Sequence, residues 1–243
     1  MMIKDLIEKA AKLPAATPRL LAISALTLCS ISAASAASIT WSNGPNFGGP
    51  NGHLGILTNG SLVEAVNLSG ASTAPPITVD PTGINITFST INSPFFNSNW
   101  ASATGGGNTD PGWSAILNTF EWQSGANVTA ANFLDSLTVG HQYQVQFFAA
   151  RTDCCATRTH WFGDSEGNLS TPINGNSYTS IVGTFTADDV DQTIQFFDST
   201  NNPILNAYVL RDITPAVPEP STWAMLLAGL GLLGFSVRRS KAG

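Results

Sequence analysis

Apolar and polar residues alternate along several segments in the middle of the chain. In the segment 141–150, apolar residues occupy every second position from Tyr143 through Val145 to Phe147, and glutamines stand between them. A period of two places the apolar side chains on one face of an extended strand, whereas a helix would scatter them around its axis. The pattern therefore predicts a half-buried β-strand.

The same alternation recurs before and after this segment. Residues 84–91 and 191–197 alternate similarly, and further strands are predicted at 61–67, 114–122, 158–163, 178–186 and 204–212. Clusters of Gly, Asn, Pro, Ser and Asp separate these segments, which is typical of turns. Residues 130–137 are the one segment for which a helical turn is considered. Many short strands with turn-rich connections predict an all-β fold, an antiparallel β-sandwich of the jelly-roll type.

The first 36 residues follow a different pattern. Basic residues within the first nineteen positions precede a mostly apolar run from Leu20 to Ile31, and small residues follow from Ala33 to Ser38. A basic region, a short apolar core and a small-residue site are the parts of a secretory signal peptide. The run is shorter than the roughly 20 residues of a membrane-spanning helix. Ala34 and Ala36 fit the two small pockets of signal peptidase, so cleavage is predicted after Ala36.

Residues 217–243 contain three modules in order. The first is a peptide that its prolines hold extended, made of Val217, Pro218, Glu219 and Pro220. The second is an uncharged apolar stretch, predicted to be a hydrophobic helix, at 223–237, and the third is the basic pair Arg238 and Arg239. Basic residues beside such a segment stay on the cytoplasmic side. The three modules together predict a removable tail, held in the membrane for a processing enzyme, with an ordinary short anchor as the alternative.

This tail resembles the PEP-CTERM sorting signal of Gram-negative bacteria. The resemblance implies that an exosortase-type membrane transpeptidase recognises the Pro218-Glu219-Pro220 tripeptide and cleaves the chain near it. It also implies transient insertion into the inner membrane, followed by delivery to the cell surface or extracellular matrix, often in bacteria that make exopolysaccharide. The expected organisation is a signal peptide at 1–36, a β-sandwich domain at 37–216 and the sorting signal at 217–243.

The charge of the expected domain is strongly negative. Residues 37–216 contain three arginines, no lysine and thirteen acidic residues, a net charge of −10. Binding to DNA or RNA depends on basic side chains that neutralise phosphates and release counterions. The composition therefore excludes nucleic acid as a partner.

Within this domain, residues 132–213 resemble a recurring module of secreted bacterial proteins, the galactose-binding-domain-like jelly rolls. The cues lie at 133–140, 143–148, 182–188 and 205–211. The resemblance implies carbohydrate binding, although a fold does not by itself fix a function.

No catalytic arrangement stands out in the sequence, and an enzyme is not expected. The three histidines are scattered, and no serine lies in a Gly-x-Ser-x-Gly motif. Glu64, Glu121 and Glu166 could in principle supply a carboxylate pair for glycoside hydrolysis, but sequence does not give their separations. Solvated surface acids are the alternative interpretation.

Two acidic turns are considered as calcium sites, and no other cofactor is expected. Asp164, Glu166 and Asn168 stand at alternate positions around the glycine turn at Gly167, and Asp188 and Asp191 lie in a second acidic cluster. Calcium prefers such oxygen ligands, but neither segment matches the twelve-residue calcium loop. Ordinary acidic turns are the alternative.

The segment 150–161 is the candidate ligand-binding loop. It brings Arg151, Asp153, Arg158 and Trp161 into one connection between strands. The arginines and the aspartate could bind sugar hydroxyls while Trp161 stacks on a sugar ring. The alternative is that Arg151 pairs with Asp153 and that Trp161 belongs to the core.

Three functional hypotheses follow from the sequence. The leading one is a non-enzymatic surface or matrix protein whose β-sandwich binds or associates with exopolysaccharide. The second is a structural, adhesive matrix component with no discrete ligand site. The third is a polysaccharide-degrading enzyme.

Overall fold

The computed structural model describes residues 37–69, 74–101, 107–151, 157–215 and 228–230. The predicted signal cleavage site at Ala34 and Ala36 lies outside the described residues. So do Asp153 and the residues predicted to form the sorting motif, which are Val217, Pro218, Glu219, Pro220, Arg238 and Arg239.

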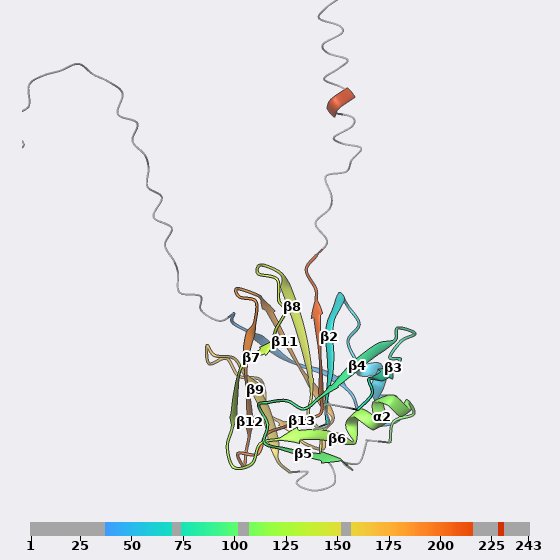
Figure 1. The fold of residues 1–243 in the computed structure, drawn as a ribbon, viewed down its shortest axis with the longest axis vertical. Coiled ribbons are helices and arrows are strands. Elements are labelled where there is room, and N and C mark those ends of the chain that lie inside the picture. Colours follow the sequence, from blue (N-terminus) through green and yellow to red (C-terminus); the bar gives the residue numbers. More distant parts are fainter. Residues whose placement is uncertain (1–36, 70–73, 102–106, 152–156, 216–227, 231–243) are drawn as a thin grey trace, which may run out of the picture. The chain divides into compact units, whose positions relative to one another are not determined.

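The largest sheet has seven strands and forms one layer of the fold (Figure 1). In spatial order its strands are β1 (Thr40–Asn46), β11 (Thr179–Thr186), β8 (Gln142–Phe148), β14 (Ala207–Asp212), β2 (Ser61–Leu68), β4 (Ile86–Ile91) and β3 (Ile77–Val79). Neighbouring strands are antiparallel except for β2 and β4, which are parallel. This sheet is the main sheet below.

A second sheet of four strands covers part of the main sheet. Its order is β10 (Ile173–Asn174), β9 (Thr159–Gly163), β12 (Gln192–Asp198) and β7 (Val128–Leu134). A third sheet combines β13 (Ile204–Leu205), β6 (Thr119–Trp122) and β5 (Ser98–Ala101). The all-β, antiparallel sandwich predicted from the sequence is therefore confirmed.

Aromatic side chains fill the space between the main sheet and the second sheet. Phe147 of β8 stacks on Phe162 of β9, with ring centres 4.7 Å apart. Phe196 of β12 packs edge-on against Phe133 of β7 at 4.9 Å. All four rings are buried, and burial of side chains this large is the main favourable contribution to folding. The predicted alternation in β8 is thus confirmed, because its apolar positions face this core.

The opposite face of the main sheet is also covered. Gln146 of β8, on that face, is 1% exposed. Its Nε2 donates to the Gly55 carbonyl (2.8 Å) and its Oε1 accepts from the Leu57 N–H (2.9 Å). The short 3-10 helix η2 (Gly52–Gly55) and the residues after it therefore cover the polar face of β8.

Helix α2 (Pro111–Leu117) packs on this same face and corrects one prediction. The sequence predicts a single strand at 114–122, but the structure has a helix followed by β6. The Asp110 side chain accepts the Trp113 N–H (2.7 Å), and proline occupies the first turn, which together start a helix. Trp113, Ile116 and Leu117 then fall on one buried helical face.

A second prediction is wrong at residues 130–137, where a helical turn was considered. Most of this segment belongs to β7, which pairs with β12. The pairing shifts register between Gln192 and Ile194, which lie opposite Leu134 and Ala130. An advance of two residues along β12 therefore corresponds to four residues along β7. The extra residues of β7 form a bulge, which disrupts the alternation of apolar and polar residues expected of a strand.

Candidate functional site

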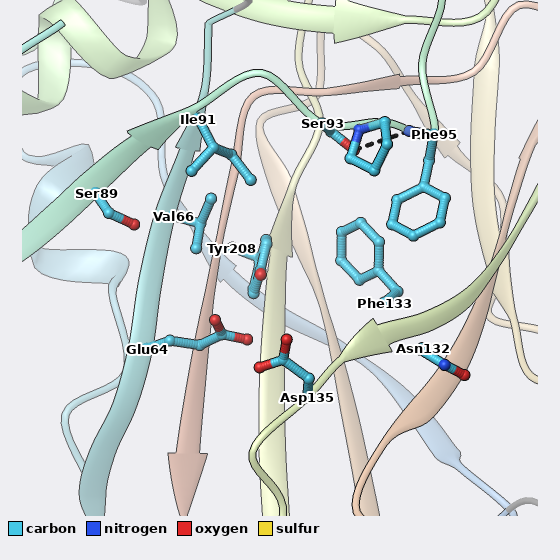
Figure 2. Close-up of a pocket in the computed structure, with 11 residues that line it drawn as sticks. Glu64, Val66, Ser89, Ile91, Ser93, Phe95, Asn132, Phe133, Asp135 and Tyr208 are labelled. Atoms are coloured by element: carbon cyan, nitrogen blue, oxygen red, sulfur yellow. Dashed lines mark hydrogen bonds between the residues drawn. The ribbon is translucent and has the colours of Figure 1, made fainter. Parts of the chain in front are cut away.

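A cavity of about 350 Å³ lies between β2, β4 and β14 of the main sheet and β7 with the loop after β4 (Figure 2). The second sheet has fewer strands than the main sheet, and β7 is its edge. The volume is within the range of small-molecule sites. The lining residues come from β2, β4, β14, β7 and the loops beside them: Glu64, Val66, Ser89, Ile91, Ser93, Pro94, Phe95, Asn132, Phe133, Asp135 and Tyr208.

The strand register brings the polar groups of the main sheet into this cavity. Glu64 and Val66 are two residues apart on β2, so they point to the same face. Tyr208 of β14 pairs directly with Val66, and Ser89 of β4 pairs with Val66 on the other side. Residues far apart in the sequence therefore form one wall.

Glu64 is the most perturbed acid of this wall. Burial raises its pKa to about 7; a hydrogen bond with the Tyr208 side chain opposes that rise, and the nearby charge of Asp135 adds to it. Its Oε1 is buried without a hydrogen-bond partner. The pKa of Tyr208 is raised well above its usual value by burial and by the Glu64 charge. Near neutral pH, Glu64 therefore exchanges a proton while Tyr208 stays neutral.

Asp135 faces Glu64 from the opposite side of the cavity. Figure 2 shows the two carboxyl groups pointing toward one another, Glu64 from β2 and Asp135 from the end of β7. The two groups come from different sheets, so their approach depends on how the sheets pack. This juxtaposition is the chemical centre of the site.

Aromatic rings form the apolar wall of the same cavity. Phe133 lies 5.0 Å from the Tyr208 ring and 5.8 Å from the Phe95 ring, measured between centres. Phe95 is held by a buried acid: Glu121 is 1% exposed, and its two carboxylate oxygens accept the Ser93 N–H at 2.9 and 3.0 Å. Ser93 Oγ in turn accepts the Phe95 N–H. Glu121, one of the acids considered for hydrolysis, therefore positions the aromatic loop.

The backbone beside Asp135 is strained. Asn132 has φ 57° and Ser136 has φ 61°, both in the left-handed region. Non-glycine residues adopt that region at a cost of about 1 kcal/mol or more, and such strain concentrates at functional sites. Together with the bulge in β7, it directs Asn132, Phe133 and Asp135 to the cavity.

The candidate loop of the sequence analysis lies elsewhere. The guanidinium of Arg151 sits 4.9 Å above the Phe120 ring. Trp161 is half-buried in β9 and stacks on Phe197 of β12, with ring centres 5.7 Å apart and planes 6° apart. Arg151, Arg158 and Trp161 are absent from the lining of the cavity. A role for them in ligand binding stays a prediction.

Arg151 and Arg158 influence the pKa of His160, which forms a buried pair with Asp198. His160 Nδ1 lies 3.1 Å from Asp198 Oδ2, and both side chains are almost fully buried. Burial lowers the pKa of His160 to about 4; the Asp198 charge opposes this, and the two arginines add to it. His160 is therefore neutral at the pH of most extracellular media.

The acidic residues considered as calcium ligands lie in two separate loops, and one of them, Asp164, already accepts several hydrogen bonds. Asp164 is fully buried, and its carboxylate accepts four hydrogen bonds, from the N–H groups of Ile39, Glu166 and Asn168 and from the Asn168 side chain. Asp188 is exposed and Asp191 is half-buried in another loop. Within the described ranges, no group of three or more acidic, His or Cys side chains could hold a metal ion. Asp164 instead fastens the start of the domain to the turn after β9.

Comparisons with known proteins define the C-terminal segment of the chain more clearly than its domain. Residues 216–240 match the model of the PEP-CTERM protein-sorting motif. No curated protein matches the chain significantly. Among solved structures, a Bacteroides uniformis β-glucuronidase aligns with 62% of this chain and 18% of its own, at 13% identity and a TM-score of 0.39. This chain thus spans under a fifth of that enzyme, and the likeness supports no inference about activity.

Fold and motif together define an exported β-sandwich protein. More particularly, it carries a PEP-CTERM signal, the type of signal that an exosortase processes. Over the part of the chain that the structure describes, no helix is long and apolar enough to cross a membrane.

Of the site residues, sequence reasoning considered only Glu64, and only as one acid among several. One signal was available. Glu64 lies on a strand whose following alternate positions, Val66 and Leu68, are apolar. A charge on an otherwise apolar face must find a partner or a ligand.

Proposed function

We propose that this protein is a non-enzymatic component of the cell surface or extracellular matrix and that its β-sandwich binds exopolysaccharide. The cavity between β2, β14 and β7 is the proposed binding site. The observation that carries the proposal is the combination, in one cavity, of two carboxyl groups with a wall of aromatic rings.

This combination suits the chemistry of a sugar. A pyranose has hydroxyl groups that donate hydrogen bonds and a ring face of C–H groups that packs on aromatic side chains. Glu64, Asp135 and Asn132 offer acceptors, and Phe95 and Phe133 offer apolar surface. The Oε1 of Glu64 is shielded from water and has no protein partner, which favours the neutral carboxyl in the unliganded protein.

The sorting motif supplies the context for such a ligand. We propose that the signal peptide is removed at Ala36, that the tail inserts transiently in the inner membrane, and that exosortase cleaves near Pro218-Glu219-Pro220. A protein released in this way meets polysaccharide at the cell surface, and its acidic composition disfavours nucleic acid.

A second candidate, a glycoside hydrolase, is favoured by one specific observation. Glycosidases pair a protonated carboxyl with an ionised one, and Glu64, with its pKa near 7, faces Asp135. The experiment must therefore separate binding from hydrolysis.

The test is to titrate the full-length protein with exopolysaccharide isolated from the source bacterium, by calorimetry, and to assay new reducing ends in the same mixtures. Glu64→Gln and Phe95→Ala should weaken binding at least about tenfold, the factor that corresponds to 1.4 kcal/mol. Asp189→Asn, which removes one charge from an exposed turn, should leave it unchanged. Absence of binding would favour the adhesive component without a ligand site. Reducing ends that vanish in Glu64→Gln would favour the hydrolase.

A further inference from the structure

The cavity holds negative charge that no lining residue neutralises. Its eleven lining residues include Glu64 and Asp135 but no lysine, arginine or histidine. Arg211 lies on β14, as Tyr208 does, but donates to the carbonyls of Leu57 and Gly60. Since like charges that share a site disfavour ionisation, Glu64 and Asp135 together form a site that gains from a bound cation.

We infer that the cavity selects saccharide units that carry a protonated amine, and that the ammonium group binds between the Glu64 and Asp135 carboxylates. The inference rests on the proposed function, because it names the class of sugar that this same site prefers. It goes beyond that function, because a neutral polysaccharide would satisfy the first proposal and contradict this one.

Geometry favours an ammonium group over a hydroxyl group. The two carboxyl groups point toward one another from β2 and from the end of β7, so a group between them contacts both (Figure 2). An ammonium group brings three donors and a positive charge, and hydrogen bonds in which both partners are charged are about twice as strong as neutral ones.

The aromatic wall adds to the same preference. Tyr208, Phe133 and Phe95 form a connected set of rings beside the carboxyl groups. Aromatic faces attract cations as well as sugar C–H groups. An amino sugar presents both an ammonium group and a ring face, so it uses the two walls of the cavity at once.

Other charged ligands fit less well. An acidic sugar would add a third negative charge to a site that has no cation among its lining residues. A divalent metal ion needs a larger set of ligands, and no group of three acidic, His or Cys side chains gathers anywhere in the described residues.

The test compares three tetrasaccharides of the same linkage, titrated into the full-length protein at pH 7: β-1,4-linked glucosamine, N-acetylglucosamine and glucose. The glucosamine tetramer should bind at least about tenfold tighter than the two neutral tetramers. This is the change in affinity expected from the loss of one charged hydrogen bond. Glu64→Gln and Asp135→Asn should each remove this preference, while Asp189→Asn should keep it. Thermal unfolding of each variant checks that it is folded.

A fourth probe, which does not itself titrate, measures how ionisation of the carboxyl groups affects binding. The glucosamine tetramer with trimethylated amines carries a permanent charge but no N–H donor, so it tests the charge of the carboxyl groups and not the hydrogen bonds. The titratable groups that face Glu64 are Asp135 and Tyr208. With a Glu64 pKa near 7, the affinity for this probe should rise about tenfold from pH 6 to pH 8. The rise should be absent in Glu64→Gln.

The outcomes separate this inference from the proposed function. If the neutral tetramers bind as tightly as the glucosamine tetramer, the inference is wrong and polysaccharide binding stands. If both carboxyl variants keep the preference for the glucosamine tetramer, the ammonium site is wrong. If neither the tetramers nor the exopolysaccharide binds, both proposals are wrong.

Discussion

Glu64 and Tyr208 form a hydrogen bond between neighbouring strands of the main sheet, with both side chains largely removed from water. The bond ties a titratable carboxyl on β2 to a hydroxyl on β14. Burial nevertheless outweighs it, and the pKa of Glu64 rises to about 7. The consequence is a carboxyl that changes charge within the range of environmental pH.

The stability of the domain should fall as pH rises because of Glu64. Its pKa is about 7 in the folded protein and 4.5 in the unfolded chain, so the folded state binds more protons between these values. The stabilising contribution is present below pH 4.5 and is lost as pH rises through 7, by at most about 3 kcal/mol. Glu64→Gln should flatten this fall, as measured by urea unfolding at pH 5, 6, 7 and 8.

Asp189→Asn is the control for the loss of one negative charge, because Asp189 is exposed. It should keep the pH dependence of the parent protein. Equal slopes for the parent protein and Glu64→Gln would mean that Glu64 has an ordinary pKa.

His160 should produce the opposite dependence on the acid side. Burial lowers its pKa to about 4, below the 6.5 of the unfolded chain, so the unfolded state binds the proton first on acidification. Stability is therefore lost as pH falls from 6.5 through 4. His160→Gln should reduce this acid sensitivity, although it lowers stability at pH 7 by disturbing the contact with Asp198. Thermal midpoints at pH 7, 6, 5 and 4.5 measure the effect, and parallel curves would contradict it.

Local patterns of the sequence predicted the strands with clear alternation, because strand periodicity is a property of neighbouring residues, but β1, β3, β5 and β10 were not predicted. The alternation of Tyr143, Val145 and Phe147 depends on no distant contact. Helix α2 was missed although Asp110 and Pro111 form a standard helix start, since apolar residues on both sides of it favoured a strand. The bulge in β7 was missed because its cause is the pairing with β12.

The site was harder to predict than the fold. Glu64, Asp135 and Tyr208 lie in three separate parts of the sequence, and only the packing of two sheets joins them. Trp161 is the opposite case, a residue with a conspicuous local sequence that does not line the cavity. Its unusual neighbours in sequence suggested a ligand loop or a core position, whereas the structure places it half-buried against Phe197.

Asp164 should stabilise the domain without a metal ion. Its carboxylate already accepts hydrogen bonds from Ile39, Glu166 and Asn168. Asp164→Ala would leave the buried Ile39 N–H without its acceptor and should cost about 3 kcal/mol or more in unfolding free energy. Asp189→Ala should cost little. Calcium and EDTA should both leave the thermal midpoint of the parent protein unchanged, and a rise with calcium would support the calcium hypothesis instead.

The sorting motif should determine where the protein ends up. Residues 216–240 match the PEP-CTERM motif, and the sequence predicts that the two prolines around Glu219 hold that peptide extended for an enzyme. Replacing Pro218, Glu219 and Pro220 with alanine should leave the tail uncut and the protein in the inner membrane. Fractionation followed by mass spectrometry of the C-terminal peptide measures both effects. The matched control replaces the exposed prolines Pro75 and Pro76, which should leave cleavage and export unchanged. Mature extracellular protein that retains Trp223 to Gly243 would contradict the processing step, because an exosortase substrate must lose its hydrophobic segment to leave the membrane.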